Sequence, residues 1–571
     1  MKIHAFLTAG MLCLFGIAHG QKISFEIDSN TTAVYSDVIQ FYEELDAKYE
    51  EAKLVKAGKT DSGRPLHTFI ISKNQYFTPD EAKRAGKTVL LINNGIHPGE
   101  PEGIDASMML ARDLLKSGDW NENLVICIIP VYNIGGMLIR GTSRANQNGP
   151  NEYGYRGNAN NYDLNRDFIK TDTRNSQSFQ EIFNAWDPDV FMDTHTSNGA
   201  DYQYVMTLIE TQIDKLHPSL QESANSLTQQ LYAQMEDVGY EMVPYVTFRG
   251  RNPESGIVSF MESPRYSTGY ASLKHTIGYM PETHMWKPYH DRVKSTYQLL
   301  KALIRSTGEL GPEIRQSRLK LKEEIQKQNT FTLSWSLDTT RHEMLNFKGY
   351  TSGTKKSDIH GQDRMFYDRN QPFTKEIKYF RHYKPNIQVE KPKAYYIPQS
   401  WVRVLDLLKL NGVVMEEVQE DQVMVMERYR ILSYQTSSQP SEGHYPHSQV
   451  KLEKMMDTVQ VFKGDYIVST SQPQVRYIIE TLEPEAVDSF FNWNFFDSIL
   501  SRKEYYSAYI FEDYAFQMLN QNSSLKKEFE KLKSEDSKFA SDSRMQLEWL
   551  FNKSPFYSDI PMKYPIGRII N

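Results

Sequence analysis

The first half of the chain alternates short apolar runs with longer segments in which apolar residues recur at helical spacing. The short runs are typical of buried strands, and they lie at residues 88–92, 124–131, 189–192 and 277–280. The helical segments lie at residues 38–49, 102–116, 174–186, 216–239 and 289–308. Strands that alternate with helices predict an α/β protein, here a three-layer α/β/α sandwich around a mixed central sheet.

Two further features belong to this half. Residues 53–57 and 67–71 predict a hairpin, because Asp61-Ser-Gly63 between them is a turn sequence. Residues 137–162 are rich in Gly, Asn and Arg and poor in apolar residues, which indicates a long loop. A long ordered loop within a compact domain is often functional.

The pattern changes after a charged helical segment at residues 315–327. Residues 330–389 alternate polar and apolar positions with a period of two, which indicates β-strands. Residues 394–410 predict one strand followed by one helix. Residues 500–553 are highly charged and predict a mostly helical segment.

At 571 residues the chain is too long for one ordinary core, so we expect several domains. We predict an α/β domain at residues 21–310, a helical linker at residues 311–329, and a mixed β-rich and α-helical region at residues 330–571. A polar loop in the last region contains His444 and His447, which we expect to be solvated rather than to act as ligands.

The N-terminus has the features of a secretory signal at residues 1–20. Lys2 supplies a positive start, residues 5–18 are apolar, and Ala18 and Gly20 are small residues at the positions that precede a cleavage site. No later run reaches the roughly 18 apolar residues of a membrane-spanning helix. The sequence therefore predicts an exported protein, periplasmic or secreted.

Charge and cysteine content narrow the chemistry. A formal net charge of −7 and a pI near 6.1 argue against nucleic acid as a partner. Of the two cysteines, Cys13 lies in the signal and Cys127 in an apolar run, so the mature chain has no disulfide framework. Any bound metal must be held by histidines and carboxylates.

The candidate metal ligands follow predicted strands. His97 and Glu100 come directly after residues 88–92, and His195 comes after residues 189–192. Two histidines and one glutamate are a known set of ligands for catalytic zinc, which leaves a fourth position for water or substrate. Zinc lowers the pKa of its bound water toward about 7 and polarises a carbonyl group.

Hydrolysis also needs a carboxylate that accepts the proton of the water. Glu282 ends a predicted strand in apolar surroundings, where partial burial would raise its pKa. Alternatively, Glu282 pairs with His284 or Arg265. Asp163 could accept the second N–H of His97 and fix the orientation of that ring, or it could be an ordinary turn residue.

Two further side chains are suited to binding a carboxylate. The guanidinium of Arg166 can hold a carboxylate through two hydrogen bonds, and Asn165 adds a neutral donor. The alternative for Arg166 is a surface salt bridge.

Together these motifs resemble the zinc carboxypeptidases of the carboxypeptidase A type over residues 35–307. The motifs that carry the resemblance are His97-Pro-Gly-Glu100, Asn133-Ile-Gly-Gly136, Ser143-Arg144-Ala-Asn146, Asp163-Leu-Asn-Arg166, Thr194-His195 and Glu282. The resemblance implies that His97, Glu100 and His195 bind one zinc ion, Zn2+, per chain. It also implies that Glu282 acts first as general base and then as general acid.

The resemblance assigns roles to other residues as well. Arg144 would polarise the scissile carbonyl and stabilise the oxyanion, with Arg140 and Arg156 as competitors for that role. Asn165 and Arg166 would hold the free C-terminal carboxylate of the substrate.

This sequence departs from the family at two places. The family has a mobile Tyr that caps the substrate terminus, and here we favour Tyr270 over Tyr266, although both lie closer to Glu282 than is usual. Asp167 replaces the usual Asn and adds negative charge near the carboxylate site. Residues 330–571 resemble the extra region that follows the catalytic domain in some bacterial exported relatives, and we assign them no chemistry.

The resemblance implies an exported metallocarboxypeptidase whose substrates are the C-termini of peptides or proteins. Two alternatives stay open. The chain could cleave murein-type peptides or another amide outside the cell, because Asp167 puts the terminal carboxylate of the substrate in doubt. It could also be a non-catalytic binding protein on the same fold, although the intact set of zinc ligands and Glu282 speaks against that. The sequence indicates no oligomeric state.

Overall fold

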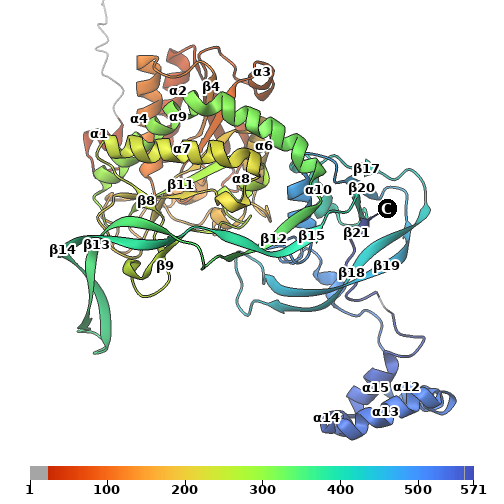
Figure 1. Ribbon diagram of the computed structural model, residues 1–571. Coiled ribbons are helices and arrows are strands. Elements are labelled where there is room, and N and C mark those ends of the chain that lie inside the picture. The colour runs from red at the N-terminus through yellow and green to blue at the C-terminus, as the bar shows by residue number, and fades with distance from the viewer. Residues whose placement is uncertain (1–22, 559, 571) are drawn as a thin grey trace, which may run out of the picture.

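The computed structural model describes residues 23–558 and 560–570, so the predicted signal at residues 1–20 lies outside the described residues. The N-terminal half is built on a nine-stranded mixed sheet, which confirms the predicted fold class (Figure 1). Its strand order is β1-β2-β4-β3-β5-β11-β7-β8, with β6 paired to β11. The strands are β1 (Ala52–Lys59), β2 (Pro65–Ile71), β3 (Thr88–Asn93), β4 (Leu124–Ile129), β5 (Val190–Asp193), β6 (His195–Ser197), β7 (Met206–Glu210), β8 (Val243–Pro244) and β11 (Ile277–His284).

The middle of this sheet is parallel, because β3 pairs in parallel with both β4 and β5, and β11 in parallel with β5 and β6. The β1–β2 hairpin joins one side of the sheet and β7 the other, both in antiparallel pairing. The carboxyl ends of β3 and β5 therefore lie side by side, where the loops after them can meet.

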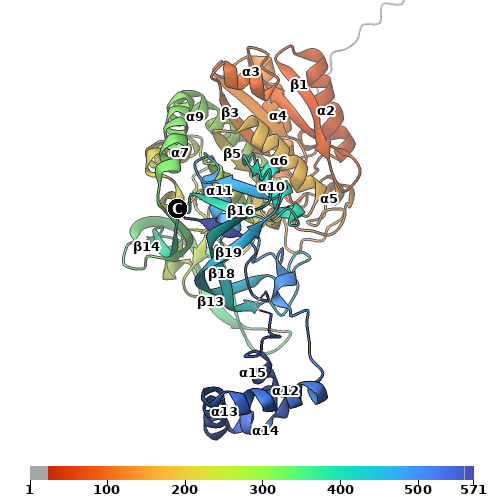
Figure 2. The ribbon, with the colours of Figure 1, turned by 90° about the vertical axis from the view of Figure 1, so that its right-hand side faces the viewer.

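Helices cover both faces of the sheet. Figure 2 shows β3 and β5 between α7 and α9 on one side and α6 on the other. The helices of this half are α1 (Ser24–Ile27), α2 (Tyr35–Lys48), α3 (Pro79–Arg84), α4 (Glu102–Ser117), α5 (Ile134–Leu138), α6 (Arg174–Trp186), α7 (Pro218–Asp237), α8 (Ser267–Leu273) and α9 (Tyr289–Glu324). Short 3-10 turns at Leu164–Arg166, Ile213–Lys215 and Pro253–Ser255 complete it.

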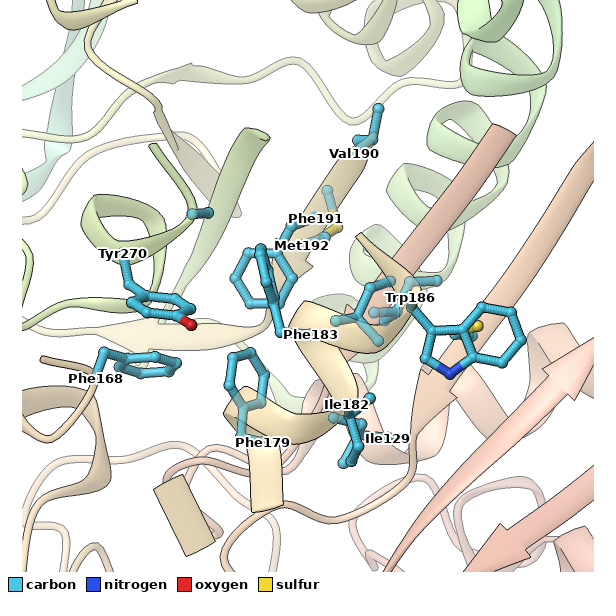
Figure 3. Packing of buried hydrophobic residues seen from close by; sticks show 14 of the residues in the cluster. Ile129, Phe168, Phe179, Ile182, Phe183, Trp186, Val190, Phe191, Met192 and Tyr270 are labelled. Atoms are coloured by element: carbon cyan, nitrogen blue, oxygen red, sulfur yellow. The ribbon is translucent and has the colours of Figure 1, made fainter. Parts of the chain in front are cut away.

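Aromatic side chains fill the layer between α6 and the sheet (Figure 3). Phe183 of α6 packs edge-on against Phe191 of β5 and Tyr270 of α8, with ring centroids 5.6 and 5.4 Å apart. Helix α6 begins where the Thr173 side chain accepts a hydrogen bond from the backbone of Ser176. This packing holds α8, and the loop before it, against the sheet.

The separate linker helix predicted at residues 315–327 does not exist as such, because α9 runs without interruption from Tyr289 to Glu324. Gly311 and Pro312, which lie between the helical segments expected at residues 289–308 and 315–327, are within it. Gly311 is needed for close packing, since a Cβ there would lie 2.5 Å from Thr88 Oγ1. The predicted boundary at residue 310 thus falls inside one helix.

The C-terminal half is rich in β-structure, as its alternating pattern indicated. A six-stranded sheet has the order β17-β20-β16-β21-β18-β19, and β13 and β14 form a long hairpin that continues through β10 to β9. The strands are β9 (Thr247–Phe248), β10 (Ile257–Val258), β12 (Thr330–Leu337), β13 (Glu343–Lys356), β14 (Asp363–Phe380), β15 (Tyr383–Glu390), β16 (Ala394–Ile397), β17 (Glu416–Glu417), β18 (Gln422–Thr436), β19 (His447–Val461), β20 (Tyr466–Ser469) and β21 (Gly567–Ile569).

Helices of this half fall into two groups. Helices α10 (Val402–Leu410) and α11 (Val475–Leu482) belong to the main body, whereas the remaining helices form a cluster set apart from it (Figures 1 and 2). That cluster has its own small aromatic core and consists of α12 (Ala508–Gln521), α13 (Ser523–Glu535), α14 (Ser537–Ser541) and α15 (Ser543–Phe551). None of the described helices is long and apolar enough to cross a membrane.

One apolar core continues from the first half into the second. At the junction, Tyr270 donates a hydrogen bond to Asn411 Oδ1 at 2.8 Å, and Asn411 Nδ2 donates to the hydroxyl of Tyr477 at 2.9 Å. The expectation of a solvated His447 is wrong. This residue is 5% exposed, and its two ring nitrogens lie 3.0 Å from Thr436 Oγ1 and 2.9 Å from Asp497 Oδ1.

Candidate metal and substrate site

Three of the predicted side chains meet at the carboxyl ends of β3 and β5. His97 Nδ1 lies 3.3 Å from Glu100 Oε1, and His195 Nδ1 lies 3.3 Å from Glu100 Oε2. One ligand atom from each residue lies within 4.8 Å of the others, and all three side chains are buried. The arrangement follows from the parallel pairing of β3 with β5, which aligns Asn93 with Asp193.

The residues fit a metal ion. The Nε2 atoms of both rings lie 2.8 Å from a carboxylate oxygen, Asp163 Oδ1 for His97 and Asp193 Oδ2 for His195. Because an ionised carboxylate only accepts, each Nε2 carries a hydrogen, which places the lone pair of the neutral ring on Nδ1. His97 Nδ1 is buried without a hydrogen-bond partner in the described chain. Two such nitrogens beside a carboxylate are a donor set suited to zinc.

Two arginines compensate the charge of Glu100. Arg144 forms an ion pair with Glu100 and donates to the carbonyl of Thr196 at 3.0 Å. Arg156 lies 3.4 Å from Glu100 Oε1 and 2.8 Å from Asp163 Oδ2. Burial alone would raise the pKa of Glu100, but Arg144 and the neighbouring imidazoles hold that pKa well below its usual value. Glu100 is therefore ionised and ready to bind a cation.

Glu282 lies inside β11 rather than after its end, because pairing with β6 and β7 extends the strand to His284. It stands beside His195 in the register of β11 and β6. Burial, with the nearby charge of Glu100, raises the pKa of Glu282 to about 8, against the opposing effect of His195. A cation bound at Glu100 would lower this pKa again, because positive charge favours the carboxylate.

Neither alternative partner pairs with Glu282 within the described chain. The ring of His284 is hydrogen-bonded to the carbonyl of Ala200 at 2.9 Å, and Arg265 donates to Asp488 at 2.8 Å. The side chain of Glu282 instead lines the same cavity as His97, Glu100 and His195.

That cavity has a volume of about 340 Å3. It is lined by His97, Glu100, Arg144, Arg156, Asn165, Arg166, His195, Thr196, Ser197, Asn198, Ile209, Tyr245, Phe260, Tyr266, Met280 and Glu282. The structure thus brings together every residue predicted for metal binding or catalysis, together with Asn165 and Arg166. Asp163 stands behind His97.

The carboxylate-binding candidates are held in place by their neighbours. Asn165 Oδ1 accepts a hydrogen bond from the backbone of Ser267 at 3.1 Å. Arg166 donates to the carbonyl of Asn165 at 2.9 Å, and its guanidinium lies over the Tyr266 ring, 4.6 Å from the centroid. Of the two competitors of Arg144, only Arg156 lines the cavity. Arg140 instead donates to the carbonyls of Ala33 and Glu152.

Tyr270, which we expected to cap the substrate terminus, lies in the core and not in the cavity. It is fully buried among the aromatic residues of Figure 3, and its hydroxyl contacts Asn411 and Asn184. Tyr266 lines the cavity in its place. The apolar face of a helix at Ser267–Leu273 would have placed Tyr270 in the core from the sequence.

Asp167 is also not part of the cavity. It is fully buried, pairs with Lys170 at 2.7 Å, and accepts hydrogen bonds from Thr173 and Ser176. The charge of Asp167 is therefore compensated by Lys170 inside the fold, and Asp167 does not line the cavity in which the terminal carboxylate is expected.

The apolar wall of the cavity consists of Ile209, Tyr245, Phe260 and Met280. The sequence suggests residues 240–275 as the source of a pocket for the terminal side chain, and this range includes Tyr245 and Phe260, but it identifies none of the four residues individually. Met280 could have been found, since side chains two apart in a strand share a face and Met280 precedes Glu282 by two. Tyr245 and Phe260 lie in a segment whose only strands are two residues long, so periodicity gave no signal.

Residues 38–233 match the sequence model of the zinc carboxypeptidase family. Carboxypeptidase 2 of Trichophyton rubrum is 21% identical over 454 residues, covering 76% of this chain and 78% of that protein, and carboxypeptidase 2 of Trichophyton equinum is similar to the same degree over 455 residues.

Among solved structures, the fold is similar to a metallo-carboxypeptidase from Burkholderia cenocepacia, with 15% identity and a TM-score of 0.36 over 47% of this chain and 68% of that one. Carboxypeptidase A from Helicoverpa armigera gives 15% identity and a TM-score of 0.38 over 48% and 74%. The family match and the two curated relatives thus agree that residues 38–233 of this chain are similar to zinc carboxypeptidases.

Proposed function

We propose that this chain is a zinc-dependent metallocarboxypeptidase that hydrolyses the C-terminal peptide bond of peptides or proteins. The observation that carries the proposal is the single cavity shared by the ligand set His97, Glu100 and His195 with Glu282 and Arg166. Chemistry and recognition of a terminal carboxylate thus have their groups in one place. The match of residues 38–233 to the zinc carboxypeptidase family supports the same function.

His97, Glu100 and His195 would hold one zinc ion, which supplies Lewis acidity and a water of lowered pKa. Glu282 accepts the proton of the attacking water and then delivers it to the leaving amine. Burial of Glu282 suits both tasks, because it brings the pKa of the carboxyl closer to neutrality. Asp163 and Asp193 keep the two imidazole rings oriented.

Asn165 and Arg166 bind the free carboxylate of the substrate, and Tyr266 lies against that arginine. Arg144 stabilises the negative charge that develops on the scissile carbonyl, with Arg156 available beside it. The terminal side chain would lie against the apolar wall of Ile209, Tyr245, Phe260 and Met280. We therefore propose a preference for apolar or aromatic terminal residues.

Replacement of Glu282 by Gln tests the mechanism. Gln keeps the size of the side chain but cannot accept the proton, so the release of C-terminal residues should fall by at least about a hundredfold. Zinc content, measured in parallel, should stay at one ion per chain. Glu420→Gln, which changes an exposed carboxylate of the other half, should leave the rate unchanged. Hydrolysis at the wild-type rate by zinc-loaded Glu282→Gln would refute the proposal.

Asp167 gives the murein-type alternative no support, because this residue lies in a buried network. The non-catalytic alternative is disfavoured by the intact cavity. We further propose residues 21–310 as the catalytic domain and residues 330–571 as an accessory region, joined through residues 311–329, most of which continue helix α9. Export through a signal at residues 1–20 stays a prediction.

A further inference from the structure

The turn between β18 and β19 lies against the loop that carries Asp163. Glu442 Oε2 accepts a hydrogen bond from the backbone N–H of Asp163 at 2.7 Å. Two residues later, the ring of His444 lies 2.9 Å from Asp172 Oδ2. A segment of the C-terminal half thus contacts both ends of the loop at residues 163–172.

The turn that presents Glu442 is strained. Ser441 and His444 exchange two backbone hydrogen bonds, at 2.7 and 3.0 Å, around the two central residues. Both central residues have positive φ, +49° at Glu442 and +78° at Gly443. Such turns favour Asn, Asp or Gly at these positions, and positive φ is costly for a residue such as Glu. The backbone of Glu442 therefore adopts this conformation at a cost in free energy. From this position its carboxylate contacts the Asp163 backbone.

Gly443 lets the turn approach closely. A Cβ at Gly443 would lie 2.8 Å from the hydroxyl oxygen of Tyr162, the residue just before Asp163. Because Gly443 has no side chain, the turn can come close enough to the loop for Glu442 to bind the Asp163 backbone.

Asp163 is the point through which this contact reaches the zinc site. Its Oδ1 lies 2.8 Å from His97 Nε2 and accepts a hydrogen bond from the backbone of Asn165 at 2.9 Å. Its Oδ2 pairs with Arg156 at 2.8 Å. A shift of the Asp163 backbone would therefore disturb the orientation of a metal ligand and of a residue in the carboxylate site together.

We propose that Glu442 is a positioning residue for the zinc and carboxylate sites, acting through the backbone of Asp163. This gives the accessory region a role in catalysis that its sequence did not suggest. The proposal rests on the function proposed above, since it assumes that His97 binds zinc.

The test compares Glu442→Ala with Glu442→Gln. Ala removes the carboxylate that accepts the hydrogen bond from the Asp163 backbone. Zinc should therefore dissociate into excess chelator about tenfold faster, which is the smallest effect typical of residues that orient metal ligands. The kcat of Glu442→Ala should fall as well. Its unfolding temperature should stay near that of Glu420→Gln, a control that also removes one negative charge but at an exposed position. Gln retains an acceptor oxygen and should restore most of the zinc retention.

A second pair of variants tests the distance between this turn and the loop that carries Asp163. Gly443→Ala and Gly361→Ala carry the same penalty of positive φ, at +78° and +69°, but only Gly443 has a neighbour within 4 Å of the added Cβ. Gly443→Ala should therefore release zinc faster than Gly361→Ala.

Wild-type zinc dissociation in Glu442→Ala would overturn the proposal, and so would a Gln variant no better than Ala. Zinc dissociation is measured without substrate, so its outcome is separate from the proposed activity. A wild-type chain that binds zinc but releases no C-terminal residue would contradict the proposed function and leave the comparison of these variants intact.

Discussion

Replacement of Gly103 by Ala should destabilise the protein, although Ala is the better helix former. Gly103 is the second residue of α4, and a Cβ there would lie 1.9 Å from Thr194 Oγ1 and 2.5 Å from Thr194 Cβ. These distances are far below ordinary van der Waals contact, so α4 or the strand end must move. Thr194 directly precedes His195, which links this contact to the metal site.

The magnitude follows from three contributions. Overpacking of a tight core costs about 1–3 kcal/mol. Displacement of Thr194 would break its 3.0 Å hydrogen bond to Asn94, a loss of about 1 kcal/mol. Helix propensity returns up to about 1 kcal/mol for Ala over Gly. We therefore expect a net loss of about 1–3 kcal/mol in the free energy of unfolding.

The assay is denaturant unfolding of zinc-free protein, with zinc dissociation measured on the loaded form. Gly141→Ala is the control, because a Cβ at Gly141 meets nothing within 4 Å and its stability should change by less than about 0.5 kcal/mol. Gly103→Ala should unfold at lower denaturant and release zinc faster than the control. If Gly103→Ala were as stable as Gly141→Ala, close packing of α4 on Thr194 would not describe the protein in solution.

Two further predictions concern buried carboxylates. Asp193→Asn should release zinc roughly 10–100-fold faster, because Asp193 holds the ring of His195 through its Nε2, and unchanged release would show that this orientation is not needed. Burial raises the pKa of Asp105 to about 6, so the folded state binds more protons than the unfolded state between about pH 4 and 6. The free energy of unfolding should therefore lose about 3 kcal/mol as pH rises through that window, and Asp105→Asn, compared by denaturant unfolding at several pH values, should lack this contribution. If the free energy of unfolding depended on pH equally in the wild type and in Asp105→Asn, a contribution from Asp105 would be excluded.

Much of the α/β half was predictable because its elements are locally encoded. The run at residues 124–131 became β4, and the helix at 174–186 was found with the same bounds. His97, Glu100 and His195 could be grouped because they follow strands, and parallel neighbouring strands end at the same edge. These inferences needed only periodicity and one rule of sheet topology.

The errors arose where distant packing decides the outcome. The helix expected at residues 289–308 and most of the charged segment at residues 315–327 form one helix, in which Gly311 lets α9 approach Thr88. Tyr266 and Tyr270 are the same residue type four positions apart, and only the direction of α8 separates cavity from core. Glu442 lies 279 residues from the backbone group it binds, and no local pattern signals such a contact.

The apolar core shared by the two halves has a consequence for synthesis of the protein. The face of α6 and α8 around Tyr270 is covered by Asn411 and Tyr477, which leave the ribosome long after the zinc ligands do. A nascent chain that ends before these residues exposes that face to solvent, a situation that favours chaperone binding or aggregation. Folding of the N-terminal half is thus coupled to synthesis of residues 411–477, and a fragment that lacks them would expose the aromatic face around Tyr270.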